Sequence, residues 1–190
     1  ACVLLLVISI AAYYFWHRSN AESGRAKITQ VSQSNKPINT ATLSPDGHAV
    51  AFTSPIRGFD QVFLMLTSGG DPLQLTNDQG DKFVESFSPD GKEIYYGADF
   101  GRRIWAVPTL GGTPRRVASA ASVLPSPDGT WLFCVKSDSP GIFPVGRSGL
   151  NEELVYKPNV TDLYFEPLLL FPGASDLLAR ATRSHSPNAR

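Results

Sequence analysis

Short apolar segments separated by turn residues dominate the chain from residue 41 onward. Residues 48–53, 92–97 and 130–136 carry apolar side chains at every second position, and residues 61–66, 103–108 and 141–146 follow them after short loops. Alternation with a period of two places the apolar side chains on one face of an extended chain, so each segment is predicted to be a β-strand. The pattern predicts an all-β fold.

A Ser-Pro-Asp-Gly tetrapeptide precedes each of the first three segments and forms an internal repeat. Pro presets φ at the second turn position, Asp can accept hydrogen bonds from nearby backbone amides, and Gly accepts the positive φ that closes the turn. The copies lie at spacings of 44 and 38 residues, and we call them the SPDG turns: Ser44-Pro45-Asp46-Gly47, Ser88-Pro89-Asp90-Gly91 and Ser126-Pro127-Asp128-Gly129. The motif predicts three equivalent hairpin turns.

A second glycine-rich joint completes the repeating unit. Gly69-Gly70-Asp71-Pro72 matches Gly111-Gly112-Thr113-Pro114, and each leads into an outer strand, at residues 73–76 and 115–118. A further short strand precedes each later SPDG turn, at residues 83–87 and 122–124. Four antiparallel strands with a period near 40 residues are typical of one β-propeller blade.

The order of SPDG turn, apolar strand, loop, apolar strand and GGxP resembles the blades of TolB-like propellers, whose repeats also occur in tricorn-type and prolyl-oligopeptidase-type proteins. The resemblance covers residues 41–156. It is weaker in the third repeat, where Arg147-Ser148-Gly149-Leu150 replaces GGxP before an expected outer strand at residues 151–156. Residues 162–166 could open a fourth blade. Propellers close with typically about four to eight blades, so we expect residues 41–173 to form a partial propeller of about three blades.

The amino-terminal segment has a different character. Residues 1–16 contain no charged residue, Gly or Pro, and a helix of this length reaches about 24 Å, against roughly 30 Å for the hydrocarbon core of a bilayer. We predict a truncated transmembrane helix at residues 1–17, with a signal peptide or a buried helix as alternatives. Residues 18–40 are expected to form a linker that contains a first outer strand, and residues 174–190 a disordered tail.

Charge and cysteine content exclude several classes of function. Seventeen basic and seventeen acidic residues cancel, so no broad positive field favours nucleic acid. Cys2 and Cys134 fit neither a disulfide framework nor a metal site. His17, His48 and His185 lie in a membrane flank, a turn exit and the tail, and no metal or cofactor is expected.

Candidate catalytic and binding residues have simpler structural interpretations. No G-x-S-x-G nucleophile motif occurs, so we expect no catalytic residue. Asp46, Asp90 and Asp128 are interpreted as turn formers and not as a carboxylate cluster. The equivalent aromatics Phe63, Trp105 and Phe143 are assigned to packing between blades. The basic pairs at residues 102–103 and 115–116 are assigned to a solvated blade rim.

The resemblance implies a non-catalytic binding or sensing propeller, expected outside the cytoplasm on a single-pass membrane protein. Its context would be the sensor region of a bacterial membrane-anchored Ser/Thr protein kinase or winged-helix regulator. The alternatives are the amino-terminal propeller of a prolyl-oligopeptidase-type serine peptidase without its hydrolase domain, and a periplasmic TolB-like scaffold. The expected partners are a protein, a peptide or a small ligand on one propeller face, together with a membrane at residues 1–16.

Overall fold

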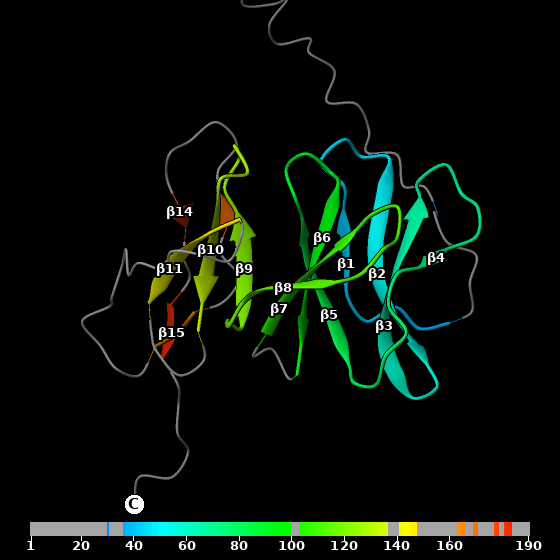
Figure 1. The fold of residues 1–190 in the computed structure, drawn as a ribbon, viewed down its shortest axis with the longest axis horizontal. Helices are drawn as coiled ribbons and strands as arrows, with labels where there is room; N and C mark the ends of the chain where they lie inside the picture. Colours follow the sequence, from blue (N-terminus) through cyan, green and yellow to red (C-terminus); the bar gives the residue numbers. More distant parts are fainter. Residues whose placement is uncertain are drawn as a thin grey trace, which may run out of the picture. The chain divides into compact units, whose positions relative to one another are not determined.

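The structure is a computed structural model that describes residues 30, 36–99, 103–136 and 141–147, together with the backbone of four short strands between residues 163 and 183. Every regular element in these ranges is a β-strand (Figure 1). The strands are β1 (Ala41–Leu43), β2 (Ala49–Ile56), β3 (Phe59–Leu66), β4 (Leu73–Gln74), β5 (Lys82–Phe87), β6 (Glu93–Ala98), β7 (Arg103–Pro108), β8 (Arg115–Ala118), β9 (Ser122–Pro125), β10 (Trp131–Val135), β11 (Ile142–Gly146), β12 (Leu163–Phe165), β13 (Leu169–Leu170), β14 (Leu177–Leu178) and β15 (Ala181–Arg183).

The first sheet follows the chain order β1-β2-β3-β4, and all its pairs are antiparallel. β2 and β3 pair along their whole length, from Ala49 opposite Leu66 to Ile56 opposite Phe59. Their two-residue turn, Arg57-Gly58, has positive φ at both positions, 53° and 86°. This turn geometry matches the right-handed twist of the strands that it joins.

The second sheet repeats this order as β5-β6-β7-β8, and the third contains β9, β10 and β11. The prediction of an all-β fold with antiparallel four-stranded sheets is confirmed for the first two units. The fourth strand expected for the third unit, at residues 151–156, lies outside the described residues. A register shift in β5 separates Val84 from Ser86 and leaves Glu85 without a paired residue on β6.

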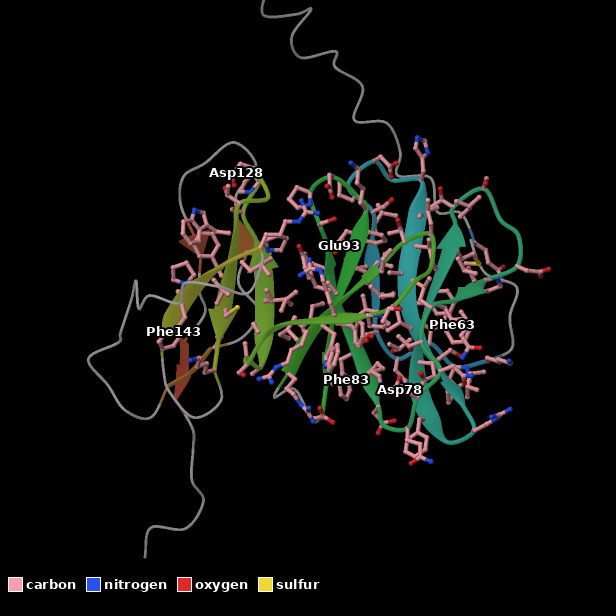
Figure 2. All side chains as sticks on the ribbon, viewed as in Figure 1. Phe63, Asp78, Phe83, Glu93, Asp128 and Phe143 are labelled. Carbon is pink, nitrogen blue, oxygen red and sulfur yellow. The ribbon has the colours of Figure 1, made fainter. Side chains whose placement is uncertain are left out.

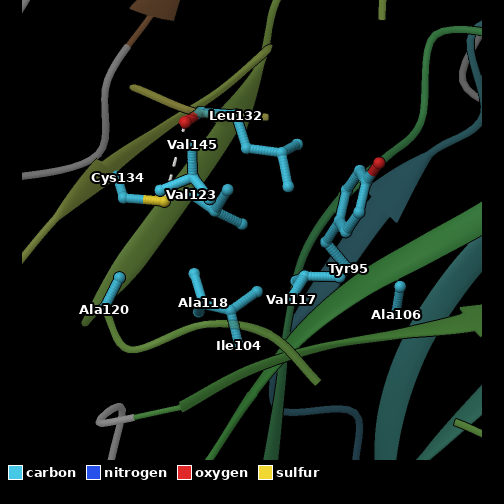
Figure 3. Packing of buried hydrophobic residues seen from close by; sticks show 10 residues of the cluster. All are labelled: Tyr95, Ile104, Ala106, Val117, Ala118, Ala120, Val123, Leu132, Cys134 and Val145. Atoms are coloured by element: carbon cyan, nitrogen blue, oxygen red, sulfur yellow. Dashed lines mark hydrogen bonds between the residues drawn. The ribbon is translucent and has the colours of Figure 1, made fainter. Parts of the chain in front are cut away.

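Consecutive sheets pack through buried apolar side chains that alternate along each strand. On β6, Ile94 and Tyr96 belong to a core shared with Ala51 and Val62 of the first sheet. The intervening Tyr95 belongs to a second core, between the second and third sheets (Figure 3). That core contains Tyr95, Ile104, Ala106, Val117, Ala118, Ala120, Val123, Leu132, Cys134 and Val145. The middle sheet is therefore buried on both faces, as expected for a blade between two others.

Complete burial of an isoleucine side chain contributes on the order of 1.5–3 kcal/mol to the free energy of folding, relative to leaving it exposed. Ile94 and Ile104, on opposite faces of the middle sheet, are both 0% exposed. Burial of both faces explains why β6 and β7 consist almost entirely of apolar residues, whereas a strand with one solvated face alternates more clearly.

Two short ladders occur after the third sheet: β12 pairs with β15, and β13 with β14. β14 and β15 lie within residues 174–190, where the sequence leads us to expect disorder, so that expectation requires correction at these strands. A strand of two or three residues is too short to show alternation and becomes recognisable only from its pairing.

Among the described residues, no helix has the length and hydropathy needed to cross a membrane. The transmembrane helix predicted at residues 1–17 lies outside these residues, and so does the first outer strand, predicted at residues 27–31, apart from residue 30. They remain predictions.

Candidate functional site

The first SPDG turn is closed by side-chain hydrogen bonds within six residues. The Ser44 hydroxyl donates to Asp46 Oδ1 at 2.6 Å and accepts from the backbone amide of Ala49 at 2.8 Å. The amide of His48 also donates to Asp46 Oδ1, at 3.0 Å. Gly47 has φ of 74°, which a residue with a side chain rarely adopts. Each residue type of the motif therefore has a defined part in the turn.

The other two SPDG turns repeat this geometry. Ser88 donates to Asp90 at 2.6 Å, and Ser126 donates to Asp128 at 2.5 Å. The hydrogen bond from the serine hydroxyl is the main reason why the pKa of Asp90 and of Asp128 falls to about 2. Each carboxylate is thus engaged in its own turn, and the three do not form a joint acidic site. We call the end of the sheets that carries these turns the SPDG end.

The glycine joints lie at the same end of the first two sheets, between β3 and β4 and between β7 and β8. Gly69 and Gly111 donate backbone hydrogen bonds to Leu66 and Pro108, each at 3.0 Å. All four glycines, Gly69, Gly70, Gly111 and Gly112, have positive φ. The joints are therefore tight turns that return the chain to an outer strand.

A cluster of ionised side chains joins the second sheet to the third at the SPDG end. Arg115 on β8 makes bidentate hydrogen bonds to Glu93 on β6, with Nε donating to Oε1 at 3.1 Å and Nη2 donating to Oε2 at 2.9 Å. Arg147, directly after β11, reaches across to Asp90 and Glu93, each at 3.2 Å. Arg115 also donates to the backbone oxygen of Arg147. Figure 2 labels Glu93 and Asp128 at this end of their sheets.

This cluster corrects the assignment of residues 115–116 to a solvated rim. Arg116 is exposed and donates to Ser119, as expected for a rim residue, but Arg115 is half-buried in the ionic cluster. Arg103 pairs with Asp99 in its own hairpin, and residue 102 lies outside the described ranges. One signal for the cluster was present in the sequence, because the third repeat has a basic residue, Arg147, at the position that Thr67 and Thr109 occupy in the first two.

Polar contacts also cross between the innermost strands of consecutive sheets. The Ser122 hydroxyl on β9 donates to Glu85 at 2.8 Å, and the residue freed by the β5 irregularity thereby reaches the third sheet. Burial is the main reason why the pKa of Glu85 is raised.

A second set of polar contacts lies within the first unit, where buried Gln61 accepts from Thr76 and donates to the backbone oxygen of Asp78. No sequence motif indicated these contacts.

The three equivalent aromatic residues do not form one surface. Phe63 stacks on Phe52 with ring centroids 5.5 Å apart, and Trp105 packs against the core between the first and second sheets. The Phe143 ring lies 4.6 Å from the ammonium of Lys136. Phe63 and Phe143 are labelled on their separate sheets in Figure 2.

Large apolar side chains are exposed around the SPDG end. Leu43 immediately precedes the first SPDG turn and is 58% exposed, and Leu110, in the turn between β7 and β8, is 93% exposed. Three further exposed apolar residues lie at the first or last position of a strand near these turns: Leu66, Leu73 and Trp131. Contact with another macromolecule is a common reason for apolar side chains to be exposed together.

Residues suited to metal binding are not gathered in the described parts of the chain, where no group of three His, Cys, Asp or Glu side chains could hold an ion. His48 is exposed beside its turn, and Cys134 is buried. Cys2, His17 and His185 lie outside these parts.

Comparison with known sequences gives a partial match. No family model matches the chain. The Tol-Pal system protein TolB of Francisella tularensis is 35% identical over 71 residues, which represent 37% of this chain and 16% of that protein. The chain therefore matches only a small part of its curated relatives.

Comparison with solved structures covers more of the chain. A protein assigned as TolB from Agrobacterium tumefaciens superposes with a TM-score of 0.72 at 19% identity, over 87% of this chain and 62% of that one. The described blades have a TolB-like β-propeller fold. A chain of the nidogen/laminin complex superposes with a TM-score of 0.52 at 16% identity, over 66% of this chain and 50% of that one. The TolB-like fold expected from the SPDG turns is confirmed, whereas the kinase or regulator context stays a prediction.

Proposed function

We propose that these TolB-like blades form a non-catalytic scaffold that binds a protein partner outside the cytoplasm. The observation that carries the proposal is the exposure of apolar side chains at the turns of the SPDG end. Leu110 is 93% exposed in a tight turn, where it contributes little to the core. A protein partner would remove such side chains from water, which favours association.

The turns at this end are closed by their own hydrogen bonds, and in the turn that carries Leu110 the Gly111 amide donates to the Pro108 oxygen. The serine and aspartate of each SPDG turn bind each other and the following backbone amides. Arg147 fixes the second sheet to the third near the same turns. A surface that is already in its binding conformation loses little entropy on association.

Absence of catalysis is part of the proposal. The aspartates of the SPDG turns are engaged in turn hydrogen bonds, and the low pKa of Asp90 and Asp128 makes these carboxylates poor proton donors or acceptors at neutral pH. Two of the similar proteins have names that refer to protein assemblies. One is TolB of the Tol-Pal system, and the other is a chain of the nidogen/laminin complex. These resemblances support a binding function, although the propeller fold also serves other functions.

Site-specific photo-cross-linking tests the protein contact. A photoreactive amino acid replaces Leu110 in the protein expressed in its native host, and a matched variant carries it at exposed Arg57, in the hairpin at the opposite end of the first sheet. We expect a discrete protein adduct from position 110 and none from position 57. No adduct at position 110, or the same adduct from both positions, would refute the proposed binding face.

Cysteine labelling tests the compartment. In a Leu110→Cys variant that also carries Cys2→Ser, the new thiol replaces a residue that is 93% exposed, whereas the native Cys134 is 1% exposed. A maleimide that cannot cross the inner membrane should label this variant in cells whose outer membrane has been made permeable. Labelling that requires lysis of the inner membrane would place the blades in the cytoplasm and contradict the extracytoplasmic part of the proposal.

The second candidate is the sensor region of a membrane-anchored kinase or winged-helix regulator, and the apolar run at residues 1–16 favours it. The coding sequence upstream of Ala1 tests it. An in-frame kinase or winged-helix domain would support this candidate, and a start codon within a few residues of Ala1 would contradict it.

A further inference from the structure

A cleft of about 450 Å³ lies between the first and second blades, toward the end opposite the SPDG turns. The loop that follows β4, including Asp78, lines one side of it. Tyr96 on β6 and Trp105 on β7 line the other side. A volume of this size falls within the range of roughly 300–1,000 Å³ that is usual for small-molecule sites.

Tyr96 places a phenol in the wall of this cleft. The residue is 3% exposed and belongs to the lining of the cleft. Burial, followed by the nearby charge of Asp78, raises the pKa of this phenol, which therefore stays neutral and can both donate and accept. A phenol in the wall of a cleft of this size can hydrogen-bond to a small molecule within the cleft.

One ordered water would not fill the cleft, because a water accounts for only about 30 Å³ of liquid volume. Trp105 adds an aromatic surface that is partly buried against the blade core. The occupant should therefore combine apolar faces with hydrogen-bonding groups at its edge.

The charges around the cleft cancel. Lys82 is buried and binds Asp78 at 3.1 Å and the backbone oxygen of Gly80 at 2.8 Å, so one of its three N–H groups is left for another acceptor. The second carboxylate of the lining, Asp99, pairs with Arg103. An anion would lie near two carboxylates and a cation near two basic groups, so the lining favours a neutral ligand.

We propose that this cleft binds a neutral saccharide unit, with one sugar face stacked on Trp105 and a sugar hydroxyl hydrogen-bonded to Tyr96. The C–H face of a pyranose is apolar and packs on aromatic rings, while its hydroxyls donate and accept hydrogen bonds. Asp78 can accept from a second sugar hydroxyl, and Lys82 can donate to a ring or hydroxyl oxygen. The inference does not depend on the protein-binding face at the SPDG end.

Ligand-observed and indole-detected NMR of the 190-residue chain tests the proposal. The probes are neutral disaccharides built from glucose, galactose, mannose and N-acetylglucosamine, with gluconate and glucosamine as charged comparisons. We expect at least one neutral disaccharide to shift the Trp105 indole N–H signal and to receive saturation from the protein. A lack of binding across the neutral panel, or equal binding of a charged probe, would overturn the proposal.

Variants then identify the contacts. Tyr96→Phe keeps the packed ring and should weaken binding roughly tenfold through loss of one hydrogen bond, whereas Trp105→Ala should abolish it. Trp131→Phe, on the third blade, should bind like the parent, and urea unfolding of each variant verifies that it is folded. Unchanged affinity in Tyr96→Phe would refute the proposed contact. A tetrasaccharide that binds more tightly than the disaccharide identifies a glycan chain as the source, and equal affinity identifies a free sugar.

Discussion

The backbone amide of Val84 donates a hydrogen bond of 3.0 Å to the hydroxyl of Thr40, 44 residues earlier in the chain. That separation equals the spacing of the first two SPDG turns. Thr40 precedes β1 and Val84 lies in β5, so the bond joins the innermost strands of consecutive blades. It shows how a repeat in sequence becomes a repeat in space: each unit forms its own sheet, and neighbouring sheets meet along their first strands.

Ser88→Ala should lower the free energy of unfolding by about 1–3 kcal/mol. Ser88 is 0% exposed, and its hydroxyl accepts from the Glu93 amide at 2.9 Å. The variant leaves that amide without its side-chain acceptor. Ser86→Ala is the matched control, because the Ser86 hydroxyl is buried without a partner, and its removal should be neutral or stabilising. Urea unfolding measures the free energy of unfolding of both variants. An equal decrease in the two would contradict a stabilising role for the hydrogen bonds of the Ser88 turn.

The pKa of Asp90 should rise toward 3.8 in the same Ser88→Ala variant. In the parent it is lowered to about 2, chiefly by the Ser88 hydroxyl. A lowered pKa means that the turn contributes stability above about pH 4, and that this contribution is lost as the pH falls toward 2. Carboxyl NMR titration measures the change. Asp128 should remain near 2, and an unchanged Asp90 would contradict the assignment.

Glu85→Gln should stabilise the protein at pH 7 and have little effect below about pH 4. Burial raises the pKa of Glu85, so the native state favours its protonated form. Stability is therefore lost as the pH rises from the unfolded pKa through the folded one. Glutamine retains an acceptor for Ser122 without the buried charge. Urea unfolding of the parent and the variant at both pH values measures the difference in the free energy of unfolding. A larger stabilisation at low pH than at pH 7 would contradict the prediction.

Arg147 and Glu93 should show a coupling free energy of about 0.5–1 kcal/mol in a double-mutant cycle of Arg147→Met and Glu93→Gln. The Arg147 side chain is 38% exposed, so water screens the ion pair and the value stays near that of surface pairs. The control is Arg103→Met, whose ion pair with Asp99 lies within one hairpin and is about half exposed. It should cost less than about 0.5 kcal/mol. A coupling free energy of zero would show that the ion pair of Arg147 with Glu93 does not stabilise the contact between the blades.

The features that the sequence predicted are those whose causes are local. The contacts of an SPDG turn run from Ser44 to Asp46 and from Ser44 to Ala49, and four neighbouring residue types are enough to specify them. The strands were likewise predicted from alternation, and β7 and β8 begin and end at the expected residues.

The contacts between blades were not predictable, because they depend on side chains brought together only by packing. Glu85 reaches Ser122 through a register shift that no residue type marks. Lys82 is a charged residue at a strand start, which usually indicates a solvated position, yet its side chain is 3% exposed because Asp78 and Gly80 bind its ammonium. The cleft beside it arises from two blades and has no motif of its own.

Amide hydrogen exchange at Val84 tests the central claim, that the repeats are TolB-like blades packed along their first strands. We expect the Val84 amide to be protected in the parent chain and to exchange faster in Thr40→Val, which keeps the side-chain shape and removes the acceptor. The Leu75 amide, bonded to Val62 within the first blade, should be unchanged. An unprotected Val84 amide in the parent, or the same exchange rate in both proteins, would contradict the packing of the two blades.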